Sequence, residues 1–168
     1  GSINVGSTQH LAAELFKSTA GIDAQVVPFN GTPAVLTALR GGQIEVGVEI
    51  LAPVLPQIKG QALRALAVTG DKRAAALPQV PTAKEAGVKT LYAASWNALA
   101  APAKTPRDIV QRLNQEIQAA LNNPDVRKKL LDMNVDPHPS SLQQAADLLS
   151  SETKRWGDVI QRAGIAKQ

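Results

Sequence analysis

Apolar positions in the first part of the chain switch between helical and strand spacing. Leu11, Leu15 and Phe16 recur at the spacing of a helix, which Gly21 is expected to close as a C-cap. Further helices are predicted over 33–40 and 51–58, and strands over 24–29, 44–50 and 63–69. Helices and strands that alternate in this way indicate βαβ units, so the expected fold class is α/β with a mostly parallel sheet.

The second part of the chain has a mainly helical pattern. Residues 70–81 are rich in turn signals and form a candidate hinge, and Thr82 with Glu85 predicts a capping box for a short helix. A strand is predicted over 95–101, followed by helices over 105–122, 123–131 and from Ser140 or Ser141 onward. We therefore expect an α/β ligand-binding lobe, 1–69, and a hinge with a mainly helical segment, 70–168.

Composition narrows the class of protein. Of the 168 residues, 44% are hydrophobic and 19% are charged, which excludes a disordered chain. The net charge is +4 and the basic residues are scattered, so no nucleic-acid partner is expected. The absence of cysteine rules out disulfides, thiolate metal ligands and a cysteine nucleophile. No apolar run approaches the roughly 18 to 20 residues of a membrane span.

Residues suited to catalysis or metal binding do not cluster in the sequence. His138 lies between two prolines, where an exposed turn is predicted. His10 stands in the first turn of the opening helix, where it either takes part in a site or satisfies local backbone groups. Spacings for a histidine metal site, a nucleophile elbow, a phosphate loop and a dinucleotide fingerprint are all absent. We therefore expect no enzyme activity, no metal ion and no cofactor.

Two helix starts and one strand end carry small or polar residues. Ser7 and Thr8 precede the first helix, Thr32 and Pro33 open the second, and Glu49 lies near the carboxyl end of a predicted strand. The first turn of a helix has unpaired N–H groups and a partial positive charge, so it attracts anions. A binding site for a carboxylate ligand is therefore predicted here. Plainer alternatives remain, namely Ser7 or Thr8 as an N-cap only and Glu49 as a solvent-exposed carboxylate.

Short motifs follow one another along the chain in a recognisable order. They are Gly6–Phe16 (GSTQHLAAELF), Val27–Gly31 (VPFNG), Leu63–Thr69 (LRALAVT), Leu77–Thr82 (LPQVPT), Glu85–Gly87 (EAG), Ser95–Trp96, Ala100–Pro102, Trp156–Gly157 and Ala163–Ile165. Together, and over essentially the whole chain, they resemble the tripartite tricarboxylate transporter receptors, also called the Bug solute-binding proteins.

The resemblance implies a two-lobed periplasmic solute-binding protein of the type II-like periplasmic-binding-protein fold. Such a protein delivers carboxylates to membrane transporter subunits and performs no chemistry. The chain corresponds to the second lobe with the C-terminal helical segments, while the family's N-terminal portion, with most of the first lobe, is missing. By position, the resemblance implies a ligand site that contains Ser2, Gly6, Ser7, Thr8, His10, Asn30, Gly31, Thr32 and Glu49.

Two departures from the family pattern lead to further expectations. Without most of the first lobe, apolar surface on the C-terminal half loses its partner, so we expect a homo-oligomer or weak ligand binding. Glu49 stands where the family commonly has Asp or Asn, and it repels a carboxylate ligand unless it is protonated or contacts an amine or hydroxyl. This speaks against a simple dicarboxylate and leaves room for amino acids or amide-containing acids. The alternative function is an effector-sensing regulatory domain of the same fold.

Overall fold

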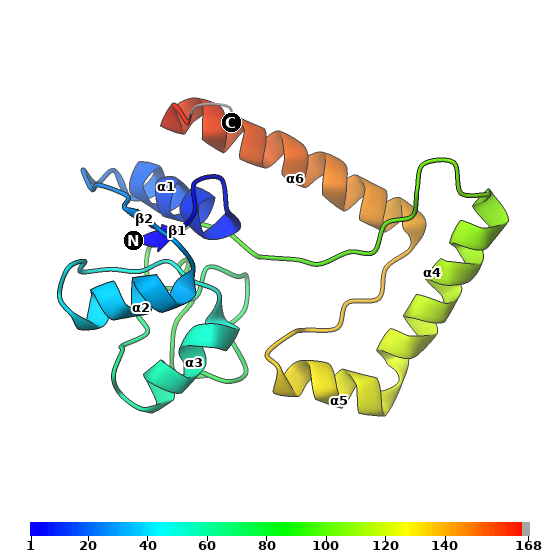
Figure 1. Ribbon diagram of the computed structural model, residues 1–168, viewed down its shortest axis with the longest axis horizontal. Helices are drawn as coiled ribbons and strands as arrows, with labels where there is room; N and C mark the ends of the chain where they lie inside the picture. The colour runs from blue at the N-terminus through cyan, green and yellow to red at the C-terminus, as the bar shows by residue number, and fades with distance from the viewer. Residues whose placement is uncertain (166–168) are drawn as a thin grey trace. The chain divides into compact units, whose positions relative to one another are not determined.

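The computed structural model describes residues 1–165 and divides the chain into two compact units (Figure 1). The first unit contains residues 1–95 together with the chain from 156 onward, and the second contains residues 96–155. All nine candidate site residues therefore belong to the first unit.

A short parallel pair of strands forms the centre of the first unit. β1 (Ser2–Ile3) pairs with β2 (Pro28–Phe29), with Ser2 opposite Pro28 and Ile3 opposite Phe29. The pairing continues one residue beyond the strand, because the Asn4 N–H donates to the Phe29 carbonyl (3.0 Å). β1 was not predicted from the sequence, since two residues are too few to show a period.

A third extended segment runs along the other side of β1. The Gly1 nitrogen donates to the Val46 carbonyl (2.6 Å), and the Val48 N–H donates to the Gly1 carbonyl (3.0 Å). This alternation of bonds is that of a parallel pair, so Gly47 lies opposite Gly1. Two residues further on, Glu49 lies level with the end of β1.

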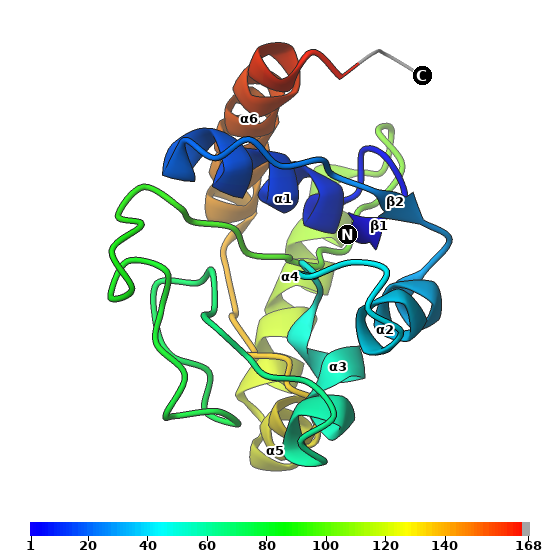
Figure 2. The same cartoon turned by 90° about the vertical axis from the view of Figure 1, so that its left-hand side faces the viewer.

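Helices cover both faces of this small sheet. α1 (Thr8–Ala20) follows β1 and α2 (Thr32–Arg40) follows β2, and both views show the strands between these two helices (Figures 1 and 2). Ile3 packs against Val35 and Ala38 of α2. Because successive side chains of a strand point to opposite faces, the Ser2 side chain points toward α1.

α1 has the predicted ends. Ser7 is its N-cap, since the Ser7 hydroxyl accepts a hydrogen bond from the His10 N–H (3.1 Å). Gly21 is its C-cap in the left-handed conformation, with φ 64°, and its N–H donates to the Lys17 carbonyl. Both features were predicted from local spacing, and both are confirmed.

α2 and α3 begin slightly differently from the prediction. α2 starts at Thr32, so Gly31 and not Thr32 is its N-cap, and no side chain caps it. The Thr32 hydroxyl is instead bonded to Glu49, 17 residues further along the chain. α3 (Leu51–Lys59) confirms the short helix predicted over 51–58.

Most of the predicted strands are shorter than expected. Within 24–29 only Pro28 and Phe29 form a strand, and 44–50 contributes only the two bonds to Gly1. Within 63–69 a single bridge joins Val68 to Thr82, and no strand is assigned over 95–101. An alternating apolar pattern reports which side chains face a core, whereas a strand also requires a continuous partner beside it.

Residues 70–95 pack in the first unit, so the units divide at 95 and 155 and not at residue 69. Leu77 and Val80 form one apolar cluster with Leu55 of α3. The predicted capping box is present, because the Thr82 N–H donates to Glu85 Oε2 (2.7 Å) and the Glu85 N–H donates to Thr82 Oγ1 (3.1 Å). It closes a single turn and not a helix.

The second unit is helical, as predicted. It contains α4 (Arg107–Asn122), α5 (Pro124–Asp132) and the first part of α6 (Leu142–Ala163). Ser141 and Gln144 form a capping box at the start of α6. The last turns of α6 belong to the first unit, where Val159 packs with Leu15 of α1. Among residues 1–165, no helix has the length and apolar character needed to cross a membrane.

Candidate functional site

The carboxyl ends of the three parallel segments lie at one edge of the sheet. β1 continues into 4–7 and α1, β2 continues into 30–31 and α2, and the segment 46–48 continues into Glu49 and α3. α1 and α2 leave this edge on opposite faces of two neighbouring strands. Open α/β sheets bind ligands at such a point, because the two helices diverge and leave a crevice between them. The nine candidate residues all lie on these three strand-to-helix units.

The N-terminus of α1 has N–H groups available for an anion. In the part of the chain that the structure describes, the N–H groups of Thr8 and Gln9 have no hydrogen-bond partner. The first turn contains no acidic side chain that would occupy them. Gln9 was not among the predicted site residues. Its position in the first helical turn was the signal that its N–H group would be unpaired.

The Ser7 hydroxyl makes two hydrogen bonds within the protein. It accepts from the His10 N–H and donates its only proton to the Ile3 carbonyl (3.0 Å). Ser7 and not Thr8 is therefore the N-cap of α1. Ser7 holds the first turn of α1 against the end of β1.

Two glycines shape the connections at this edge. Gly6 has φ 82° and Gly31 has φ 87°, which are left-handed values that strain other residues. A Cβ atom at Gly6 would meet no atom within 4 Å, so its conformation and not lack of space requires glycine there. Gly6 is exposed, and backbone without a side chain at this point leaves the start of α1 accessible.

Two buried polar side chains near α1 lack partners. Ser2 is completely buried and its Oγ has no hydrogen bond, and His10 is 6% exposed with an unpaired Nδ1, among the described residues. Ser2 points to the α1 face of the sheet. Side chains on a helix lean toward its N-terminus, so the His10 ring leans toward the start of α1. A buried polar atom without a hydrogen-bond partner lowers the stability of the folded protein by about 1 to 3 kcal/mol. A hydrogen-bond partner for either atom would therefore be stabilising.

Glu49 is half-buried at the start of α2 and is not the solvent-exposed side chain of the plainer interpretation. Its Oε2 accepts a hydrogen bond from Thr32 Oγ1 (2.9 Å), while its Oε1 is buried without a partner among the described residues. The partial positive charge at a helix N-terminus favours a carboxylate there. The protein therefore supplies its own anion at α2 and none at α1.

The amino group of Gly1 lies at the start of β1, beside the segment that leads to Glu49. Burial lowers its pKa, and the carboxylates of Glu45 and Glu49 oppose this shift. The hydrogen bond that this nitrogen donates goes to the Val46 carbonyl and not to a carboxylate. Glu49 Oε1 therefore has no donor among the described residues.

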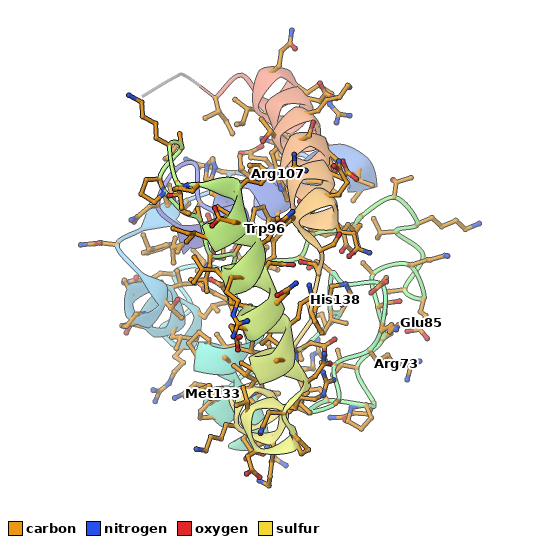
Figure 3. The ribbon with its side chains drawn as sticks, turned by 90° about the vertical axis from the view of Figure 1, so that its right-hand side faces the viewer. Arg73, Glu85, Trp96, Arg107, Met133 and His138 are labelled. Carbon is orange, nitrogen blue, oxygen red and sulfur yellow. The ribbon has the colours of Figure 1, made fainter. Side chains whose placement is uncertain are left out.

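Residues 1–165 contain no group of three histidine, cysteine or acidic side chains close enough to bind a metal ion. His138 is exposed on the connection between α5 and α6, in the second unit (Figure 3). His10 and His138 therefore lie in different units.

A surface hollow of about 310 Å³ in the first unit lies at the far end of α1 from the candidate site. It is lined by residues of the last turns of α1 and α6, among them Lys17 and Arg162. Lys17 pairs with Glu14 (3.6 Å), and Arg162 Nε donates to the Asp158 carbonyl (3.1 Å). The cations that line the hollow therefore already have partners within the protein.

Parallel segments that present helix starts at one edge are characteristic of α/β proteins that bind small anions. The sequence model of one protein family, the tripartite tricarboxylate transporter family receptors, matches residues 1–165. The chain therefore belongs to this family of solute-binding receptors. The resemblance predicted from the motifs is therefore confirmed.

Relatives and solved structures agree with this assignment. BugT of Bordetella pertussis is 31% identical over 160 residues, which are 95% of this chain and 49% of BugT. The structure of R. palustris Rpa4515 with adipate has a TM-score of 0.83 at 36% identity and covers 96% of this chain and 54% of that one. The structure of MatC from Rhodopseudomonas palustris with bound malate has a TM-score of 0.77 at 31% identity. The match covers 95% of this chain and 56% of the MatC chain.

These matches cover only part of each relative. The chain spans about half the length of most of the curated relatives that it matches. Solved periplasmic binding proteins share its fold over nearly its whole length. The predicted fold class, part of a periplasmic solute-binding protein with α/β architecture, is confirmed.

Proposed function

We propose that this chain forms a ligand-binding lobe of a periplasmic receptor, which captures a small carboxylate-bearing solute and delivers it to membrane transporter subunits. The observation that carries the proposal is the start of α1, where Thr8 and Gln9 offer N–H groups beside the buried and unpaired Ser2 hydroxyl. Similar proteins whose structures contain adipate or malate support a carboxylate as the ligand.

The proposed binding mode follows from the hydrogen-bonding capacity of these groups. One ligand carboxylate accepts from the N–H groups of Thr8 and Gln9, assisted by the helix dipole. Ser2 Oγ and His10 Nδ1 bind the same carboxylate directly or through water. Each hydrogen bond to a charged group contributes about 1.5 to 3 kcal/mol. No covalent step is involved, so the proposed role is binding and release.

Ser2→Ala tests this proposal, because it separates binding from folding. The Ser2 hydroxyl has no partner in the folded protein, so its removal should leave the free energy of unfolding unchanged or slightly higher. The affinity for a bound carboxylate should fall about fivefold, which is about 1 kcal/mol. Calorimetric titration with malate, adipate and their homologues measures the affinity, and urea denaturation measures the stability.

Ser18→Ala is the matched control. Ser18 Oγ donates to the Leu15 carbonyl (3.0 Å) near the far end of α1, so this variant should keep full affinity. The proposal is wrong if the unaltered protein binds none of these carboxylates, or if Ser2→Ala binds them as tightly as the unaltered protein.

A further inference from the structure

We propose that the solute carries a protonated amine as well as a carboxylate, and that Glu49 binds the amine. This inference rests on the proposed function, because it concerns the same site. It adds the chemical class of the ligand, an aminocarboxylate, and assigns the residue that selects it.

The first argument is the state of the Glu49 carboxylate. Oε2 is bonded to Thr32, and Oε1 is buried without a donor. Within residues 1–165 no lysine or arginine forms an ion pair with Glu49. An ionised carboxylate oxygen can only accept hydrogen bonds, so the group that satisfies Oε1 must be a donor. A second carboxylate cannot fill this role.

The second argument is the asymmetry of the two helix starts. α1 presents unpaired N–H groups, an unpaired Ser2 hydroxyl and no acidic side chain in its first turn. α2 already holds the Glu49 carboxylate through Thr32. Since β1 and the segment before Glu49 are hydrogen-bonded in parallel, both features lie at one edge of the sheet. A complementary ligand therefore has an anionic group for α1 and a cationic donor for Glu49.

The third argument is electrostatic. Like charges repel and opposite charges attract, and both interactions are stronger at a partly buried site than in bulk water. A plain diacid brings two negative charges to a site that already holds one. An amino group on the same carbon skeleton converts part of this repulsion into attraction, so Glu49 is expected to favour the amino member of a pair of ligands that otherwise match.

The experiment compares ligands that differ by one amino group, namely aspartate with succinate and 2-aminoadipate with adipate. We expect the full chain to bind the amino member of a pair about tenfold more tightly in calorimetric titration, as one hydrogen bond to a charged group predicts. In Glu49→Gln this ratio should fall to near one, through weaker binding of the amino acid and tighter binding of the diacid. Malate, tested beside succinate, reports whether a hydroxyl donor is enough.

Glu45→Gln is the matched control, because Glu45 is an exposed acid four residues before Glu49 on the same segment. This variant should keep the tenfold ratio. The inference is overturned if diacids bind as tightly as their amino counterparts, if Glu49→Gln keeps the ratio, or if malate gains as much over succinate as aspartate does. Diacid binding in the first of these outcomes would leave the proposed function intact. Failure of every carboxylate to bind would overturn both.

Discussion

Ser7 illustrates how one hydroxyl can serve the fold and leave the binding chemistry to its neighbours. It joins the end of β1 to the first turn of α1 through bonds to Ile3 and His10. With these two bonds made, the backbone N–H groups of Thr8 and Gln9 are the donors that the proposed binding mode uses. In that proposal Ser7 is a positioning residue.

Ser7→Ala should lower the free energy of unfolding by about 1 kcal/mol, the usual cost of losing an N-cap. Thr8→Ala should cost clearly less, because the Thr8 hydroxyl does not cap the helix. Urea denaturation of the two variants measures the difference. Equal losses in both variants would contradict the assignment of the cap to Ser7.

The sequence predicts single residues well where the partner is near along the chain. The caps at Ser7, Gly21 and Ser141 each depend on groups three or four residues away, and spacing located Gly21 directly and the other two to within one residue. The bond from Thr32 to Glu49 spans 17 residues. It depends on how the segments pack, so Thr32 was assigned to the wrong role and the half-buried state of Glu49 was not predicted.

At the scale of elements, the long helices were predicted more accurately than the strands. The sequences of α4, α5 and α6 contain local signals for where each helix begins. One example is Asn123, whose side chain accepts hydrogen bonds from the N–H groups of Asp125 and Val126. A helix is stabilised mostly by bonds within one segment. The strand β1 exists only because Pro28–Phe29 and residues 46–48 lie beside it, and no local pattern contains that information.

Two glycines in helical elements should respond oppositely to the same substitution. Gly157 lies within α6, and a Cβ there would meet no atom within 4 Å, so Gly157→Ala should stabilise the protein by about 0.5 to 1 kcal/mol. Gly21 also has open space, but its φ is 64°, so Gly21→Ala should cost about 1 kcal/mol. Thermal or urea unfolding measures both. Loss of stability in Gly157→Ala would contradict this view of α6.

The turn around Glu85 makes stability depend on pH. Arg73 Nε donates to both oxygens of the exposed Glu85 carboxylate (3.1 and 3.0 Å), and the two side chains face one another in Figure 3. These bonds, followed by the Thr82 N–H, lower the pKa of Glu85 from 4.5 to about 2. The folded pKa is depressed, so the contribution is complete above pH 4.5 and is lost as the pH falls toward 2.

The urea midpoint should therefore fall between pH 4.5 and 2.5, and it should fall less in Arg73→Gln than in the unaltered protein. Lys72→Gln is the control, since Lys72 is an exposed neighbouring cation and should leave the pH profile unchanged. Solvent screens this exposed pair, so the difference is expected to be small. Identical profiles for Arg73→Gln and the unaltered protein would contradict the role of Arg73.

At the scale of the whole molecule, the ordered motifs predicted the family, which the spacing of apolar residues alone did not. The family followed from short motifs spread from Gly6 to Ile165, and the family match covers residues 1–165. The turn-rich residues 70–81 resemble a linker in sequence, but Leu77 and Val80 are buried in the first compact unit. Self-association through exposed apolar side chains stays a prediction.

The unpaired atoms of Ser2, His10 and Glu49 mean that the empty lobe is locally frustrated. Each unpaired atom lowers the stability of the folded state. A lobe of this kind has its donors and acceptors fixed in advance, which limits the entropy lost on binding. If the chain binds a solute as proposed, occupancy relieves the frustration, and the bound form is expected to be more stable by about 2.7 kcal/mol at a hundredfold excess of solute over its dissociation constant.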